Sequence, residues 1–383
     1  MKIKKVLSVA LSAAMVMGCF GMTASAEEDL TWKIGGIGPI TGAASAYGSA
    51  AMNGAQIAVD EINAAGGING YLVEFQAEDD EHDAEKSVNA YNTLKDWGMQ
   101  ALVGTVTTAP CLAVAPLAAE DNMFMITPSA SAEECISYGT NEFRMCFTDP
   151  AQGTASAQYI GENLDVTKVG VIYDSSDVYS SGIYATFRTE AENQDFEIVA
   201  AEAFTSDSKT DFSAQLQAMV DAGAELVFLP FYYNEASIVF TQASAMEYSP
   251  LWFGVDGMDG ILSVEGFDTS LAEGVMLLTP FSADAEDELT QTFVATYEDL
   301  YGELPNQFAA DGYDCVYAIA TALETTDLDP SADASTISDA LQAAMLEISM
   351  DGLTGSGMTW DEDGEVSKSP KAVVIEDGVY VGL

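Results

Sequence analysis

Short apolar runs of strand length alternate with longer stretches of helical periodicity in the first part of the chain. Over residues 49–65 this periodicity places Ala55, Val59 and Ile62 on one face, and Gly66-Gly67 is typical of a helix end. Such alternation is typical of a parallel sheet whose crossovers are helices. We expect strands at 32–37, 72–76, 101–103 and 123–126, and helices at 49–65, 84–97 and 111–118.

The same alternation begins again after Asp149-Pro150. The second half carries expected strands at 169–173, 196–203, 226–230 and 251–255, and helices at 182–194, 211–222 and 234–246. No low-complexity linker separates the two halves, so the chain should pass between them in short crossings that form a hinge. The pattern therefore predicts an α/β protein with two lobes, each built on a parallel sheet.

Composition narrows the possible functions. Of 383 residues, 48% are apolar and 10% aromatic, which is enough for a packed interior. The 12 basic residues face 61 acidic ones, a formal charge of −49 that would repel nucleic acid and anionic lipid. His82 is the only histidine, which excludes a multi-histidine metal site and leaves any Ser-His-Asp or Cys-His mechanism dependent on this residue.

The first residues carry the pattern of an export signal. Three lysines within residues 1–5 precede an apolar run over residues 6–18, which is too short to span a bilayer, and Ala24-Ser25-Ala26 completes a cleavage site. Cleavage after residue 26 leaves 9 basic residues against 61 acidic ones, a net charge of −52. Val16-Met17-Gly18-Cys19 approximates a lipid-attachment box, so anchoring through Cys19 is the alternative. Both alternatives place the protein outside the cytoplasmic membrane, in the periplasm or at the cell surface.

Four cysteines follow the expected cleavage site, at Cys111, Cys135, Cys146 and Cys315, and none belongs to a C-x-x-C pair. Export permits a disulfide between Cys135 and Cys146, and buried free thiols are the alternative. The spacing alone does not decide between them.

Ligands of open parallel sheets bind beyond the carboxyl ends of the strands, where helix N-termini present free N–H donors. The loops after the expected strands, at residues 38–42, 104–109 and 127–131, are rich in glycine and hydroxyl residues. Their glycines do not follow the G-x-G-x-x-G spacing, and no G-x-x-x-x-G-K-[ST] loop occurs. We therefore expect a small ligand at these loops, with no nucleotide cofactor and no metal.

Several short motifs follow one another along nearly the whole chain after residue 27. They are Gly38-Pro39-Ile40-Thr41-Gly42, Ala46-Tyr47-Gly48, Asn53-Gly54-Ala55, Gly66-Gly67-Ile68-Asn69-Gly70, Asp79-Asp80, residues 104–108, Ile126-Thr127-Pro128-Ser129-Ala130-Ser131 and Met358-Thr359-Trp360-Asp361. In this order and spacing they resemble the leucine/isoleucine/valine-binding proteins, the extracellular solute receptors of branched-chain amino-acid ABC transporters.

The resemblance implies a type I periplasmic-binding-protein fold, in which two Rossmann-like lobes with parallel sheets are joined by a three-crossing hinge. The N-terminal lobe would comprise residues 27–147 plus about 280–353. The C-terminal lobe would comprise residues 148–279 plus about 354–383.

The resemblance also places the carboxylate-binding positions of the family on Thr108 and Ser131, in a loop that includes Ser129 and Ala130. A helix start opened by a hydroxyl residue is a suitable place for an anion. The alternative is that Thr108 and Ser131 only cap helices.

The ammonium group of the ligand would be bound by the backbone carbonyl of Ser129 and by the acidic side chain of Asp256. The family usually carries glutamate at the latter position, so this carboxylate reaches less far. Asp259 is the substitute if the alignment is shifted, and a solvated acid is the alternative for both.

The aromatic positions of the family fall on Tyr47 in the first lobe and on Tyr179 and Tyr232 in the second. Tyr233 is the alternative to Tyr232, and ordinary packing is the alternative for all of them. The family often has a disulfide that joins the loop after Asp79-Asp80 to the carboxylate loop. This chain has His82 and Thr107 there, so that bridge cannot form, and we expect His82 at the surface.

The resemblance implies a substrate-binding protein, not an enzyme, that captures a branched-chain or similarly apolar amino acid between its lobes and delivers it to a membrane permease. It would act as a monomer, without cofactor or nucleic acid. One alternative is a receptor of the same fold for amides, urea-like compounds or aromatic acids. Another is an extracellular hydrolase that uses an acid pair such as Asp79 and Asp80, against which the missing nucleophile and base argue.

Overall fold

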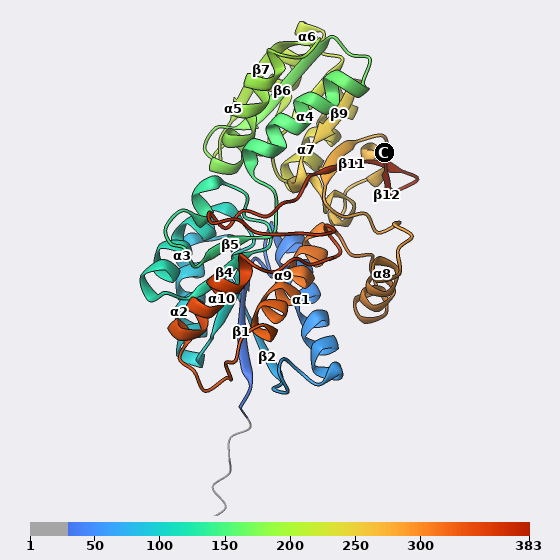
Figure 1. Ribbon diagram of the computed structural model, residues 1–383. Helices are drawn as coiled ribbons and strands as arrows, with labels where there is room; N and C mark the ends of the chain where they lie inside the picture. The colour runs from blue at the N-terminus through green and yellow to red at the C-terminus, as the bar shows by residue number, and fades with distance from the viewer. Residues whose placement is uncertain (1–29) are drawn as a thin grey trace, which may run out of the picture. The chain divides into compact units, whose positions relative to one another are not determined.

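The computed structural model describes residues 30–383, so the expected signal at residues 1–26 and the alternative anchor Cys19 lie outside the described residues. Two sheets organise the described residues (Figure 1). One has five strands in the order β2-β1-β3-β4-β5, and the other has seven in the order β12-β11-β10-β9-β8-β6-β7. The predicted α/β class, with two sheets dominated by parallel strands, is confirmed.

The first sheet is parallel throughout. Its strands are β1 (Trp32–Gly38), β2 (Val73–Asp79), β3 (Ala101–Gly104), β4 (Phe124–Thr127) and β5 (Glu142–Arg144). Its crossover helices are α1 (Ser45–Ala65), α2 (Ala84–Trp97) and α3 (Thr108–Asp121), and η1 (Glu133–Ile136) is a short 3-10 helix. Helices α1 and α3 begin a few residues before the periodic pattern does, because their first turns carry site residues rather than a core stripe.

The second sheet has a parallel body and an antiparallel edge. Its strands are β6 (Lys168–Asp174), β7 (Glu197–Phe204), β8 (Leu226–Leu229), β9 (Leu251–Gly254), β10 (Met276–Thr279), β11 (Lys371–Glu376) and β12 (Val379–Gly382). Its helices are α4 (Asp149–Asn163), α5 (Val178–Ala191), α6 (Ser213–Ala222) and α7 (Tyr233–Ala245). The hairpin of β11 and β12 adds an antiparallel edge that the pattern does not predict.

The chain passes between the two halves three times, because α9 (Gln307–Glu324) and α10 (Ala334–Met345), which follow β10, pack against β3 and β4 of the first sheet before the chain returns to β11. It first passes from β5 to α4, and then from β10 to α8 (Glu288–Tyr301), α9 and α10. The last passage leads into β11. Trp360 Nε1 donates to the Arg144 carbonyl of β5, and Arg144 N–H donates to the Gly364 carbonyl. These contacts favour a third crossing that lies just before β11.

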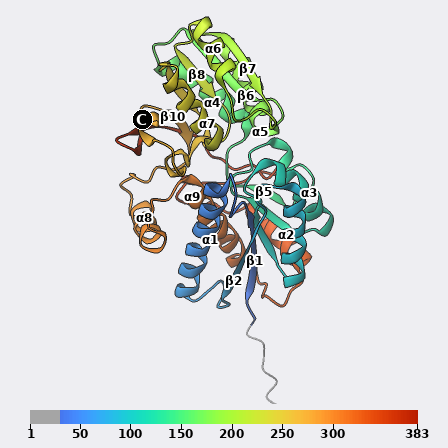
Figure 2. The same cartoon turned by 180° about the vertical axis from the view of Figure 1, so that it is seen from behind.

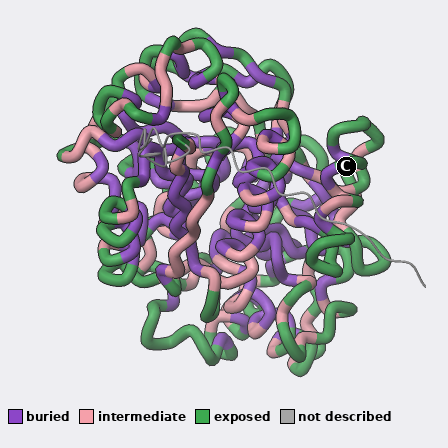
Figure 3. Tube along the Cα trace, turned by 90° about the horizontal axis from the view of Figure 1, so that it is seen from below, coloured by how far each residue is buried: buried purple, intermediate pink, exposed green. Residues whose placement is uncertain are grey.

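Alternate residues of the central strands face opposite helix layers. Val169 and Val171 of β6 pack in a cluster with α4 and α5, whereas Ile172 packs in the cluster that contains residues of α6 and α7. Figure 3 shows buried stretches running through the interior of the trace, with exposed stretches at its periphery. Among residues 30–383, no helix has the length and apolar character needed to cross a membrane.

All four cysteines of the described part are buried and free. Cys135 Sγ lies near the Thr108 carbonyl, at 4.0 Å, and Cys111 Sγ lies 3.7 Å from the Cys135 carbonyl. The structure therefore has buried thiols and no Cys135–Cys146 bridge.

Helices α1 and α9 lie against each other in both ribbon views (Figures 1 and 2). Glycines permit this approach, because a Cβ atom at Gly54 would lie 1.8 Å from the Ala309 carbonyl oxygen, and one at Gly312 would lie 2.1 Å from the Ala51 carbonyl oxygen. Backbone atoms cannot withdraw as a flexible side chain can. The contact fixes the position of α9, whose first turn reaches the site described below.

We predict that Gly54→Ala lowers the free energy of unfolding by about 1 to 3 kcal/mol or more, because the added methyl group overpacks the α1–α9 contact. Urea unfolding measures this change. Gly182→Ala in α5 is the matched control, since a Cβ there makes only ordinary contact, 3.4 Å from Asp149 Oδ2, and should keep or raise stability by up to about 1 kcal/mol through helix propensity. Equal stability of Gly54→Ala and the parent protein would contradict the packing argument.

Candidate functional site

Helix N-termini from both sheets converge on one small cavity. Its lining residues are Tyr47, Val106, Thr107, Thr108, Ser129, Tyr179, Tyr232, Asp256, Gly257 and Phe308. The free volume, about 10 Å³, is enough for about one water molecule. Of the predicted site residues, the structure brings Tyr47, Thr108, Ser129, Tyr179, Tyr232 and Asp256 to this wall.

The topology explains why these side chains meet. Thr108 is the first residue of α3, and Tyr179 and Phe308 are the second residues of α5 and α9. Tyr47 lies in the first turn of α1, and Tyr232 immediately precedes α7. In a parallel sheet the crossover helices begin near the carboxyl ends of the strands, so their positive dipole ends point into the same region.

Asp256 is the buried acid of the cavity. It begins the short 3-10 helix η2 (Asp256–Met258), separated by one residue from the end of β9, and is 4% exposed. Its Oδ1 accepts hydrogen bonds from Tyr179 Oη at 2.5 Å and from Gly257 N–H at 2.7 Å. Burial raises the pKa of Asp256 to about 6, although these hydrogen bonds oppose the shift.

Tyr47 joins the α1 end of the cavity to the loop after β9. Its hydroxyl donates to the Gly257 carbonyl at 2.5 Å and accepts from Tyr233 N–H at 3.3 Å. Burial raises the pKa of Tyr47 and of Tyr179 well above the usual value, so both hydroxyls stay protonated and can donate. The hydrogen bonds of the Tyr47 and Tyr179 hydroxyls thus connect the first turns of α1 and α5 to Gly257 and Asp256.

Aromatic rings occupy most of the space between these polar groups. The Tyr179 and Tyr232 rings stack at 4.8 Å with an interplanar angle of 5°. Phe308 packs on Tyr47 with ring centroids 4.5 Å apart. An amino-acid side chain therefore needs these rings to separate before it can enter.

The loop after β4 lies beside the cavity. Ser129 Oγ donates to the Val106 carbonyl at 2.6 Å, and Ala130 N–H donates to Thr127 Oγ1 at 2.9 Å. Ala130 and Ser131 are completely buried and do not line the cavity in this conformation. The Ser131 hydroxyl has no hydrogen-bond partner, so it remains available to an acceptor that enters the loop.

Buried polar groups at the start of α4 extend this region, and sequence reasoning missed them. Asp149 is 2% exposed and donates its N–H to the Ser131 carbonyl at 2.9 Å. Burial raises the pKa of Asp149 well above its usual value; the Ser131 hydroxyl is near enough to oppose this shift but is not in hydrogen-bond geometry. In the sequence, Asp149-Pro150 indicated only where the alternation of strands and helices begins again, and nothing about the site.

The structure corrects the prediction that His82 is a surface residue. Its ring is half-buried, Nδ1 lies 2.9 Å from Thr107 Oγ1, and its centroid is 5.6 Å from the Tyr232 ring. Burial, aided by Lys209, lowers the pKa of His82. The only sequence signal for this contact was that His82 and Thr107 occupy the two positions where the family often has a disulfide.

The two alternative residues have other contacts. Asp259 Oδ2 accepts from the Gln307 N–H at 2.9 Å, at the first turn of α9, and Asp259 does not line the cavity. The Tyr233 hydroxyl donates to the Ala43 carbonyl at 2.9 Å, behind Tyr47. Asp256 and Tyr232, not these neighbours, reach the cavity.

The periplasmic binding protein family matches residues 31–378 of the chain. The Leu/Ile/Val-binding protein homolog 3 of Brucella melitensis is 32% identical over 67% of this chain and 68% of that protein. The leucine-, isoleucine-, valine-, threonine-, and alanine-binding protein of Pseudomonas aeruginosa is 28% identical over 93% of this chain and 92% of that one. A crystal structure of the branched-chain amino acid transporter substrate binding protein LivJ from Streptococcus pneumoniae, in complex with isoleucine, matches with a TM-score of 0.83 at 30% identity. It covers 91% of this chain and 97% of that one.

We predict that the protein becomes more stable as the pH falls from 8 to about 5, by at least about 2 kcal/mol. Burial raises the pKa of several carboxyl groups above their value in the unfolded chain, so the folded state binds more protons in this range. These groups are Asp80, Glu142 and Asp311, each at about 7, and Asp177, Asp256 and Asp259, each at about 6.

Urea unfolding at successive pH values measures this dependence. His82, whose pKa is lowered, acts in the opposite direction, but it is a single group. Asp80→Asn should flatten part of the curve between pH 5 and 7. A stability that rises steadily from pH 5 to pH 8 would reject the assignment.

Proposed function

Because the chain belongs to the periplasmic binding protein family, we propose that it is the substrate-binding protein of an ABC transporter and captures a branched-chain or similarly apolar amino acid. The sequence resemblance is thereby confirmed at the level of the family. The observation that carries the proposal is a buried acid, Asp256, that shares one cavity with the hydroxyl residue opening α3, Thr108. A zwitterion presents an ammonium group to the acid and a carboxylate to the positive end of the helix that Thr108 opens.

The carboxylate of the ligand would be bound at the first turn of α3 and at the loop after β4. Thr108 lies at the positive end of a helix, and the Ser131 hydroxyl lacks a partner. Both features favour an anion. Ser131 does not line the cavity in this conformation, so its side chain would rotate to bring the hydroxyl to the bound ligand.

The ammonium group would be bound by Asp256 and by the backbone carbonyl of Ser129. An ammonium ion beside a buried carboxylate stabilises its ionised form, which burial alone disfavours. Relatives named for leucine, isoleucine and valine binding support an amino acid as the ligand. An aromatic acid or a urea-like compound would leave Asp256 without a cation.

The side chain of the ligand would lie among Tyr47, Tyr179, Tyr232 and Phe308, after the stacked rings have separated. We propose that the cleft opens to admit the ligand and closes around it, and that the closed form then docks on a membrane permease. No bond is made or broken in this cycle. We further propose that the protein is a monomer outside the cytoplasmic membrane.

We assign the lobes of this cycle to residues 27–147 plus about 280–353 and to residues 148–279 plus about 354–383. The contacts of Trp360 and Gly364 with β5 argue that the last boundary lies nearer to β11.

Isothermal titration calorimetry with single amino acids tests the proposal. We expect leucine, isoleucine or valine to bind, and Asp256→Asn to weaken binding by about 2 to 5 kcal/mol, because a buried cation loses its partner. Glu265→Gln, an exposed acid that follows in the same segment, is the charge-matched control and should bind like the parent protein. Binding of benzoate or urea, with no response to any amino acid, would replace the proposed ligand by the alternative.

The same carboxylate predicts a pH dependence of binding. Because the pKa of Asp256 is about 6 without ligand, the site becomes protonated below this pH and must release a proton to pair with ammonium. The dissociation constant should therefore rise by up to about tenfold per pH unit below pH 6 and stay level above pH 7. Asp256→Asn should lose this dependence, and an unchanged pH profile in that variant would assign it to another group.

A further inference from the structure

Arg144 is the only arginine buried in the described residues, and its side chain is 0% exposed. It is the last residue of β5, next to the first crossing between the sheets. A guanidinium is rarely buried without several acceptors, since its desolvation is costly. Its contacts therefore indicate what it holds in place.

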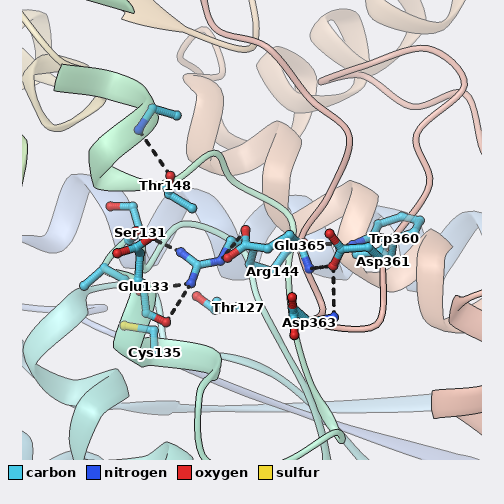
Figure 4. A network of polar contacts seen from close by, with 12 residues as sticks. Thr127, Ser131, Glu133, Cys135, Arg144, Thr148, Trp360, Asp361, Asp363 and Glu365 are labelled. Carbon is cyan, nitrogen blue, oxygen red and sulfur yellow. Dashed lines mark hydrogen bonds and ion pairs between the residues drawn. The ribbon is translucent and has the colours of Figure 1, made fainter. Parts of the chain in front are cut away.

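The guanidinium faces the loop that follows β4 (Figure 4). Nη1 donates to the Ser131 carbonyl at 2.8 Å. Nη2 donates to the Ala132 carbonyl at 3.0 Å and to the Glu133 carbonyl at 3.3 Å. One side chain thus holds three successive carbonyl groups of this loop. Arg144 itself does not line the cavity.

The C-terminal segment closes the other side of Arg144 (Figure 4). Glu365 Oε2 lies 3.1 Å from Nε, an ion pair without hydrogen-bond alignment of the N–H. The backbone of Arg144 is held by Trp360 Nε1 at 2.8 Å and by the Gly364 carbonyl at 3.1 Å. Gly364 has φ +78°, and a Cβ there would lie 2.2 Å from the Glu142 carbonyl oxygen. This close approach requires glycine.

We propose that Arg144 is a positioning residue for the carboxylate of the ligand: it holds the carbonyls of residues 131–133 from behind, so that the Ser131 hydroxyl and the N–H groups of this loop can face the anion. The inference rests on the proposed function, since it assumes a carboxylate at Thr108 and Ser131. In each of these trans peptides the N–H lies opposite the carbonyl, so the groups concerned are the N–H groups of residues 132–134. A hydrogen bond from the guanidinium to a carbonyl polarises that peptide, which makes the N–H of the same peptide a stronger donor.

Lys368 provides a control, because it is a buried cation whose ammonium is paired outside the carboxylate loop. Its ammonium pairs with Asp311 at 3.1 Å, both side chains are almost fully buried, and it lies just before β11. Among the described residues its ammonium forms no hydrogen bond or ion pair with residues 129–133. Lys368→Met therefore removes a buried charge near a crossing without touching the carboxylate loop.

The test compares leucine with leucinamide, which keeps the ammonium group and the side chain but lacks the carboxylate. Arg144→Lys keeps the charge but loses the planar fork of donors. We expect it to weaken leucine binding by about 10-fold to 100-fold, because several charge-assisted hydrogen bonds to the loop are lost. Leucinamide binding should change by less than about threefold, so the ratio of the two affinities falls.

Glu365→Gln should lower the same ratio by a smaller factor, and it decides the question if Arg144→Lys does not fold. Lys368→Met should lower the urea midpoint and leave the ratio unchanged. If Arg144→Lys folds and has the same ratio of leucine to leucinamide affinity as the parent protein, the inference is overturned. If Arg144→Lys does not fold, an unchanged ratio in Glu365→Gln overturns it. A parent protein that binds neither compound overturns the proposed function instead.

Discussion

Helix N-termini provide the positive potential of the site in a protein that has few cations to place there. The chain carries 61 acidic residues against 12 basic ones, so a carboxylate would be repelled by most of its surface. The parallel topology overcomes this difficulty, because α1, α3, α5, α7 and α9 all begin at the cavity. The dipoles of these helices place positive potential at the cavity without a counterion.

Asp256 provides the opposite charge, and its burial couples the two halves of the site. Without a cation the carboxylate is disfavoured, which the raised pKa expresses, and Tyr179 is its main side-chain donor. The backbone carbonyl of Asp256 accepts from Gln307 Nε2 at 2.8 Å, so this hydrogen bond connects the first turn of α9 to η2. A ligand that pairs with the carboxylate would therefore favour the arrangement in which both elements are close.

The sequence predicts most of the elements and part of the site, for physical reasons that differ. The strands β1 to β4 and β6 to β9 follow from apolar runs of fixed length, whereas Asp256 and Thr108 were identified through the resemblance to the family, with which their places in strand-to-helix loops agree. Phe308 could not be predicted in this way, because it reaches the cavity only through the α1–α9 packing at Gly54. His82 was predicted wrongly, since its burial depends on Tyr232 from a segment far along the chain.

The buried cations Arg144 and Lys368 lie next to the first and third crossings, where the proposed opening of the cleft would bend the chain. A buried ion pair adds little net stability, because desolvation offsets the attraction, but the loss of one partner is costly. Such a pair therefore penalises every conformation in which its partners separate. Arg144 keeps β5, the loop at 131–133 and the C-terminal segment together, so in the proposed cycle the bending would be confined to the few residues between these anchored points.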